Sequence, residues 1–273
     1  MRRQVLPMLA LVVVAGCGKN GGTIGEWFGA TDKPQKAPVF YDALCDPSSG
    51  STCSAETLRE TSESVLREAV DRPGSIIRLW MQGRTIEGTR LVATATVPVF
   101  RVTGRRARAD VENRWVGEER DSFCSAAEPG LLKRIRRSPI AESLGLIALA
   151  SPPVRGKRQI VAITDALEVS DYGEFECGHL PKPDRFARLL GERRVLPPGS
   201  LAGVDVRFCH VDLGVIDGGR CAVSLARAAD VRTIWHAALA AAGATHIDIH
   251  PGALEPQPTT TKEAGNVQTI QSE

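Results

Sequence analysis

Apolar residues recur along this chain in short runs that are separated by segments of helical period. The runs are rich in Val, Ile, Phe and Thr, and several are bounded by Gly, Pro or Asp, which is typical of β-strands. We expect strands at 37–44, 75–81, 89–97, 158–163, 203–211 and 245–250. The run from Ile160 to Ile163 is almost uniformly apolar, which favours a central strand that is covered on both faces.

Helical periodicity follows several of these strands. After the first strand, Ser54 is placed to cap a helix in which Leu58, Val65 and Leu66 share one face. Residues 104–137 are charged and mixed, and we expect them to be helical in part. Further helices are predicted at 138–150, at 183–191 and from about Asp230 to Ala242.

The order of these elements predicts the fold class. Strands that alternate with helices indicate a doubly wound α/β sheet with helices on both faces. Gly83 and Gly88 lie between the second and third strands, so this pair can form an antiparallel hairpin. About 220 residues separate a polar, glycine-rich segment, 17–36, from a polar tail, 255–273, so we predict one domain over 37–254.

The first residues predict export. Two arginines precede an apolar run from Val5 to Val14, which is too short to span a bilayer, so residues 1–16 are interpreted as a signal peptide. The stretch from Val14 to Cys17 resembles the lipobox of bacterial lipoproteins, in which the cysteine becomes the acylated first residue. The resemblance implies a palmitate-bearing lipid anchor at Cys17. Gly18, in place of an aspartate, favours the outer membrane of the bacterial cell envelope.

Charge and cysteine content narrow the possible partners. The formal net charge is +2, and cleavage after residue 16 removes Arg2 and Arg3, so the mature chain is near neutral and nucleic acid is not expected as a partner. One basic cluster, 131–139, is either a solvated face or a contact for lipid headgroups or an acidic partner. An exported chain with six further cysteines predicts up to three disulfides. Short separations favour Cys45 with Cys53 and Cys209 with Cys221, which leaves Cys124 with Cys177.

The strand beginning "PVFYDALCDPS", the strand running into "ITDALE" and the last helix with Trp235 followed by "AAGA" resemble a von Willebrand factor type A domain over roughly residues 37–250. The resemblance implies a six-stranded, mostly parallel sheet with one antiparallel edge strand. It also implies a metal-ion-dependent adhesion site at the carboxyl ends of the strands, built from an Asp-x-Ser-x-Ser loop, a threonine and a later aspartate.

On this resemblance, Asp42 matches the first aspartate of the metal motif and Asp165 matches the later one. Leu44 and Asp46 then stand where the two serines are expected, and Thr103 is the nearest candidate for the threonine. Asp42, Asp46 and Asp165 could hold Mg²⁺ or Ca²⁺ only as three converging carboxylates. We therefore expect a degenerate site without a bound cofactor.

A second metal hypothesis concerns the last strand, where His246, Asp248 and His250 alternate with isoleucines. The three side chains would point to one side of the strand, as zinc or copper ligands would. The polar side of an edge strand explains the same alternation, and we favour that interpretation.

These observations predict a lipid-anchored, extracytoplasmic module that holds an envelope or extracellular protein. We expect the contact at loops 42–54, 101–104 and 165–183. The alternative is a metal-dependent hydrolase of the cell envelope that uses Asp42, Asp46 and Asp165. No G-x-S-x-G or phosphate-binding motif is present in the sequence, so a binding module is favoured over an enzyme.

Overall fold

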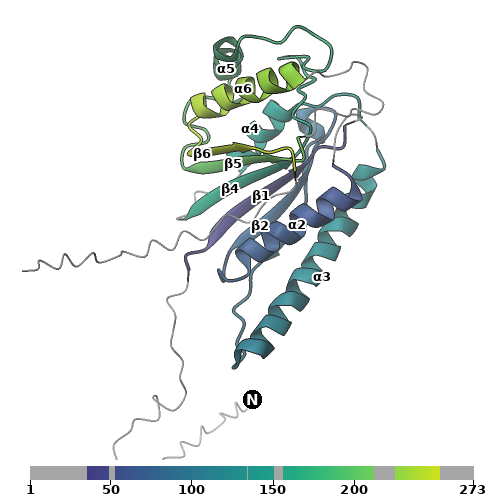
Figure 1. Ribbon diagram of the computed structural model, residues 1–273, viewed down its shortest axis with the longest axis vertical. Helices are drawn as coiled ribbons and strands as arrows, with labels where there is room; N and C mark the ends of the chain where they lie inside the picture. The colour runs from purple at the N-terminus through teal and green to yellow at the C-terminus, as the bar shows by residue number, and fades with distance from the viewer. Residues whose placement is uncertain (1–35, 49–52, 134, 151–155, 212–224, 253–273) are drawn as a thin grey trace, which may run out of the picture. The chain divides into compact units, whose positions relative to one another are not determined.

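The computed structural model describes residues 36–48, 53–133, 135–150, 156–211 and 225–252. Its centre is a six-stranded sheet in the order β3-β2-β1-β4-β5-β6 (Figure 1). The strands are β1 (Val39–Cys45), β2 (Ile76–Met81), β3 (Arg90–Thr96), β4 (Lys157–Ile163), β5 (Val204–Cys209) and β6 (His246–Ile249).

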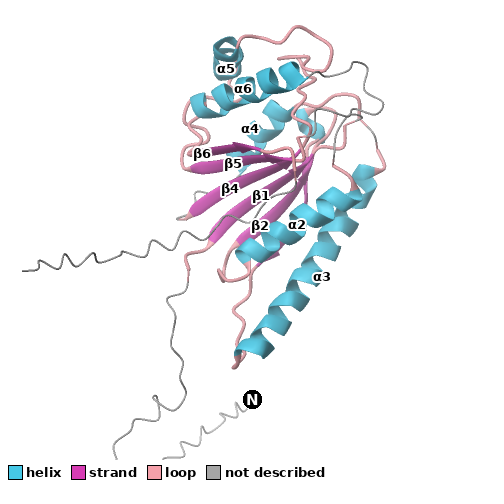
Figure 2. Cartoon of the chain, viewed as in Figure 1, coloured by secondary structure: helices cyan, strands magenta, loops and turns pink. Residues whose placement is uncertain are grey.

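Helices cover both faces of this sheet (Figure 2). One face packs against α2 (Ala55–Ala69) and α3 (Arg105–Leu131), and the other against α4 (Ile140–Ala150), α5 (Pro183–Glu192) and α6 (Leu225–Ala241). A short 3₁₀ helix, η1 (Ile86–Gly88), joins β2 to β3. The predicted doubly wound α/β fold is confirmed.

Strand pairing agrees with the predicted topology. β1 is parallel to both β2 and β4, whereas β3 is antiparallel to β2 and forms the edge. Val39 is the partner of Lys157 and Cys45 is the partner of Ile163, so the first and fourth strands are neighbours, as expected. All seven residues of β1 are buried because helices cover it on both sides, which explains why its sequence is nearly continuous in apolar residues.

Local sequence accounts for the helix boundaries. The Ser54 side chain accepts a hydrogen bond from Thr57 N, and Thr57 in turn accepts one from Ser54 N, so a capping box starts α2. The charged region 104–137 contains α3, a helix of 27 residues. Only a narrow stripe of α3, including Val116, Phe123 and Ala127, is buried, which is why its periodicity is weak in the sequence.

The two ends of the sheet receive different loops. At the amino end of β1, Ala37 O lies within hydrogen-bond distance of Arg72, and Gly74 N donates to Val97 O at 2.8 Å. The chain from residue 97 to the start of α3 therefore lies at the amino end. Helix α3 then runs to the carboxyl end, where Gly130 packs closely against Met81. The prediction that loop 101–104 joins 42–54 and 165–183 at the carboxyl end is thus wrong, because β3 runs antiparallel and carries the chain back.

Candidate functional site

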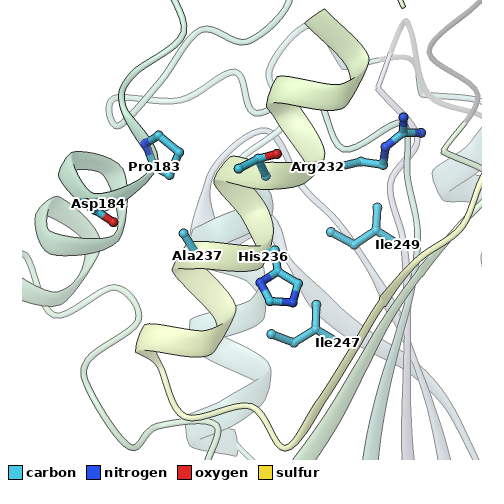
Figure 3. A pocket seen from close by; sticks show the side chains of 8 residues that line it. Pro183, Asp184, Arg232, His236, Ala237, Ile247 and Ile249 are labelled. Atoms are coloured by element: carbon cyan, nitrogen blue, oxygen red, sulfur yellow. The ribbon is translucent and has the colours of Figure 1, made fainter. Parts of the chain in front are cut away.

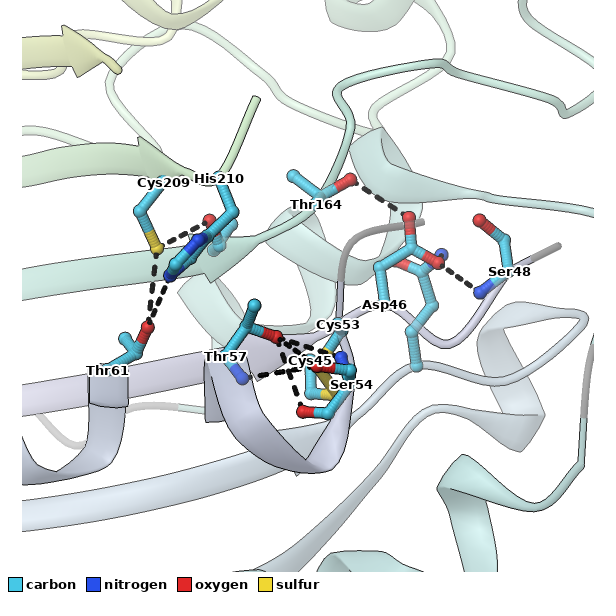
Figure 4. Close-up of a disulfide and its surroundings, with 12 residues drawn as sticks. Cys45, Asp46, Ser48, Cys53, Ser54, Thr57, Thr61, Thr164, Cys209 and His210 are labelled. Atoms are coloured by element: carbon cyan, nitrogen blue, oxygen red, sulfur yellow. Dashed lines mark hydrogen bonds between the residues drawn. A yellow bond between two sulfur atoms is a disulfide. The ribbon is translucent and has the colours of Figure 1, made fainter. Parts of the chain in front are cut away.

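Asp46 is the first carboxylate of the carboxyl end of the sheet. Its backbone N–H donates to Ile163 O at 3.1 Å, which continues the pairing of β1 with β4 by one residue. Its Oδ1 accepts from Ser48 N and Gln82 Nε2, each at 3.0 Å. Its Oδ2 accepts from Ser138 Oγ at 2.6 Å. The same oxygen accepts from Thr164 Oγ1 at 2.9 Å (Figure 4). The side chain is fully buried, and neutral donors surround it.

Two more carboxyl groups, Asp165 and Glu168, follow β4 and are also buried. Asp165 Oδ1 accepts from Leu167 N at 2.9 Å, and Glu168 Oε2 accepts from Ala141 N at 3.0 Å, at the start of α4. Burial raises the pKa of Asp165 to about 8, and nearby Asp46 contributes to this rise. Burial also raises the pKa of Glu168 to about 8, and it raises the pKa of Asp46. Asp165 and Glu168 are therefore largely protonated near neutral pH, and together with Asp46 they form a buried acidic cluster.

Asp42 does not belong to this cluster, which corrects its assignment as the first metal-motif aspartate. Asp42 pairs with Ile160 in the middle of the sheet, five positions before Asp165. Its Oδ1 accepts from Arg78 Nε at 2.7 Å and from Trp80 Nε1 at 2.8 Å, and Arg158 Nη2 lies 3.5 Å from Oδ2. Asp42 is therefore held in an ion pair within the core and is not available to a ligand at the carboxyl end.

An Asp-x-Ser spacing occurs four residues later, at Asp46 and Ser48. Asp46 directly follows β1, and its backbone N–H donates to Ile163 O, two residues before Asp165. Thr103 is exposed at the amino end of the sheet, so its assignment as the motif threonine is also wrong. Ser138, Gln82 and Thr164 contact Asp46 instead, and sequence reasoning did not identify them. The signal that was available is the Asp-Pro-Ser sequence immediately after the last apolar residue of β1.

The residues at this end do not fit a metal ion well. Asp46 has about four lone-pair positions, and four protein donors already occupy them. Within the described ranges, no group of three or more His, Cys, Asp or Glu residues could hold a metal ion. No step through a metal ion is derived for this chain.

The cysteines confirm one predicted disulfide and correct two. Cys45 and Cys53 are bonded and tie the end of β1 to the start of α2 (Figure 4). Cys124 and Cys209 are free thiols, so neither predicted pairing that contains them forms. Cys177 is disulfide-bonded, and Cys221 lies outside the described residues.

The free thiol of Cys209 is sequestered in the core. Its Sγ lies 3.5 Å from Ala162 O and 3.9 Å from Thr61 Oγ1, and burial raises the pKa of Cys209 to about 12. The adjacent His210 Nε2 lies 3.3 Å from the same threonine oxygen, and burial lowers the pKa of His210. Cys209 and His210 thus occupy the end of β5 as largely buried structural residues.

Side chains of α6 and of the core hold the loop after β4 in place. Trp235 Nε1 of α6 donates to Ala166 O at 2.8 Å, where the backbone has a positive φ of 63°. The Phe175 ring packs within 6.2 Å of Trp235, and Arg227 Nη2 donates to Phe175 O at 2.6 Å. The excursion 165–178 is therefore a packed part of the domain. Its exposed side chains, such as Asp171 and Glu174, point away from a rigid base.

A second surface feature lies away from the acidic cluster. A groove with a volume of about 560 Å³ runs between α5, α6 and the edge strand β6 (Figure 3). Ile247 and Ile249 lie along one side, whereas Arg232, His236 and Asp184 supply polar groups. His246, the first residue of β6, is exposed. His250 directly follows the last residue of β6, and its Nδ1 accepts from Gly252 N at 3.1 Å. No predicted site residue lines this groove.

Comparison with known proteins adds little to this description. No family model matches the chain, and no curated protein matches it. One solved structure that is similar is the conserved hypothetical protein BatB from Bacteroides thetaiotaomicron. It shares 12% sequence identity with a TM-score of 0.40, over 79% of this chain and 91% of that chain. We draw no conclusion from this likeness, and the fold class given above rests on the strand order and helix placement of this chain itself.

Proposed function

We propose that this chain is a protein-binding module of the bacterial cell envelope, which holds an envelope or extracellular protein at the carboxyl end of its sheet without a metal ion. The observation that carries the proposal is the burial of Asp46, Asp165 and Glu168 beneath the loops of that end. Because these carboxyl groups hydrogen-bond to the protein, they fix the loops and do not face a substrate.

The fixed loops present a mixed polar and apolar surface. Leu132, at the end of α3, has 79% of its surface exposed, and Lys133 and Arg136 beside it are exposed. Ser48 bridges to Ile135, and Arg137 Nη2 donates to Asp171 at 2.6 Å, so this basic segment is joined to both other loops. A preorganised surface of this kind loses little conformational entropy on binding a partner.

Attachment to the envelope is the second part of the proposal. Cys17 and the predicted signal peptide lie outside the described residues, so the lipid anchor rests on the lipobox resemblance. None of the described helices is long and apolar enough to cross a membrane. Acylation of Cys17, with more than one acyl chain, would supply durable attachment, and Gly18 favours the outer membrane.

Site-specific photo-crosslinking in cells tests the binding surface. A photoreactive amino acid at Leu132 is expected to give a discrete adduct with a protein partner. Leu149 is the matched control, because it is 78% exposed. It lies in the last turn of α4, where Ala148 O accepts from Arg158 Nη1 near the amino end of β4. Leu149 should give no such adduct.

The outcomes separate the alternatives. An adduct from Leu132 that survives a chelator such as EDTA supports metal-independent binding. An adduct that EDTA abolishes would restore the metal-dependent adhesion site, and equal labelling from both positions would contradict a surface at the carboxyl end. The loss of membrane association in Cys17→Ser cells, read from the same fractions, tests the anchor separately.

A further inference from the structure

A projecting tip, residues 98–106, combines basic and apolar side chains at the amino end of the sheet. It begins after Val97, which is buried, and continues into the first turn of α3. Phe100 packs against Trp115 of α3 with ring centroids 6.1 Å apart, so the loop is anchored to the helix. Outside this anchor, Val99 is 58% exposed and Arg101 is exposed.

The arginines of this tip are not part of the ion pairs described within the domain. Arg101, Arg105 and Arg106 are exposed and form no ion pair with any described residue, whereas Arg108 is paired with Glu112. No acidic residue lies between positions 98 and 108. Basic side chains at the start of a helix also oppose the helix dipole, and the first turn of α3 contains no acid to offset them. Binding to a partner outside the domain therefore explains these three arginines better than contacts within the domain do.

The tip lies at the end of the domain where the described chain begins. Lys36 pairs with Asp71, and Pro38 contacts Gly74, whose backbone N–H donates to Val97 O. The described chain therefore begins at the same end of the sheet as the tip. Figure 1 shows α3 starting at this end and running along the sheet to the opposite end.

We propose that the tip docks on the anionic headgroups of the membrane that holds the lipid anchor. The inference rests on the lipid anchoring that is part of the proposed function. Arginines supply the attraction to anionic lipid, and Val99 can enter the interface between headgroups and acyl chains. Docking of the amino end would direct the carboxyl-end surface away from the membrane, toward a protein partner.

The basic cluster 131–139 provides an internal comparison. It occupies the other end of α3, which is 27 residues long, so the two basic regions are about 40 Å apart. This separation is several Debye lengths at physiological salt, so each region responds to its own surroundings. Of the two basic regions, only the tip lies at the end of the sheet where the described chain begins, which makes the tip the one placed to face lipid.

Hydrogen exchange on the lipidated full-length protein, reconstituted in vesicles, tests the docking. The first backbone hydrogen bond of α3 runs from Arg108 N to Gly104 O, so the amides before it exchange fast in the free protein. Vesicles that contain phosphatidylglycerol should slow exchange over residues 98–106 by roughly tenfold relative to pure phosphatidylcholine. The variant Arg101→Glu with Arg105→Glu should lose this protection. The second of these changes places an acid in the first turn of α3, where the helix dipole favours it, so the helix itself should persist.

The matched control is Lys133→Glu with Arg136→Glu, which makes the same change in net charge at the other end of α3. This control variant should keep the slowed hydrogen exchange over residues 98–106 on vesicles that contain phosphatidylglycerol. Equal exchange on both lipids, in protein that remains on the vesicles, would overturn the docking while leaving the anchor intact. Equal loss in both variants would show a nonspecific charge effect and overturn it too. Protein that leaves both kinds of vesicle would refute the anchor, and the docking with it.

Discussion

Asp42 and Asp46 lie four residues apart at β1 and its end, and both are fully buried, yet the protein stabilises them in different ways. Asp42 lies in the middle of the sheet and pairs with two arginines, Arg78 and Arg158. Asp46 lies just past the strand and receives hydrogen bonds from hydroxyl and amide groups. The charge of Asp42 is balanced by two arginines, whereas Asp46 is held by hydrogen bonds from neutral donors.

The difference follows from position along the strand. Within the sheet, neighbouring strands offer side chains at fixed register, so Asp42 meets Arg78 as its direct partner. Past the strand end, loops from three parts of the chain converge, and their backbone and side-chain donors can be arranged around Asp46. The comparison shows that a buried aspartate indicates a functional site only when its strand position and its partners are known.

Removing the charge of Asp42 should have the largest effect. Asp42→Asn leaves two largely buried arginines without their counter-charge, so we expect the free energy of unfolding to fall by about 3–5 kcal/mol. Urea denaturation followed by circular dichroism would measure this loss. Asp71→Asn is the control, because its pair with Lys36 is exposed and should contribute less than about 1 kcal/mol. Equal losses in the two variants would contradict the comparison.

The acidic cluster should make the domain less stable as pH rises. Burial raises the pKa values of Asp165 and Glu168 to about 8, whereas carboxyl groups of the unfolded chain titrate near about 4. Between these values the folded state binds more protons, so the free energy of unfolding decreases with increasing pH. We expect a loss of about 2–3 kcal/mol over the single pH unit from about pH 6 to pH 7, measured by urea denaturation at each pH.

The variant Asp165→Asn with Glu168→Gln provides the control for this pH dependence. It replaces both carboxyl groups by neutral amides of similar shape, so its stability should vary much less over the same range. A variant that keeps the wild-type slope would place the titrating groups elsewhere in the molecule.

Asp46→Asn should have a smaller effect than Asp42→Asn. No buried counter-charge is left unpaired, but the amide cannot accept all of the donors that surround Asp46, so we expect a loss of about 1–2 kcal/mol. Urea denaturation of the two variants, measured in parallel, gives the ratio of their losses in free energy of unfolding. A loss for Asp46→Asn that exceeds the loss for Asp42→Asn would mean that Asp46 is ionised and balanced by a cation.

Divalent cations should have the smallest effect. With Asp46 saturated by protein donors, millimolar Mg²⁺ or Ca²⁺ is expected to leave the melting temperature unchanged relative to EDTA. A specific site filled at about a hundred times its Kd would add about 2.7 kcal/mol to the free energy of unfolding, which a thermal scan would detect. Such a shift, absent in Asp46→Asn, would restore the metal site.

Much of the architecture was predictable from local sequence. The continuous apolar run Ile160–Ile163 indicated a central strand, and Ser54 indicated a helix start, because burial and capping act on neighbouring residues. The short spacing of Cys45 and Cys53 also indicated their disulfide correctly. Asp42 was matched to the metal-motif aspartate although it lies inside β1, because both Asp42 and Asp46 follow apolar positions and the sequence does not mark where pairing with β4 ends.

The sequence by itself determined the fold class and the acidic character of the loop after β4, since each depends on periodicity and composition along the chain. Only the tertiary structure decided which carboxyl groups meet. It pairs Asp42 with arginines, gathers Asp46 with Ser138 and Thr164, and sends Thr103 to the opposite end of the sheet. These outcomes depend on strand direction and register, which bring together residues that are far apart in the sequence.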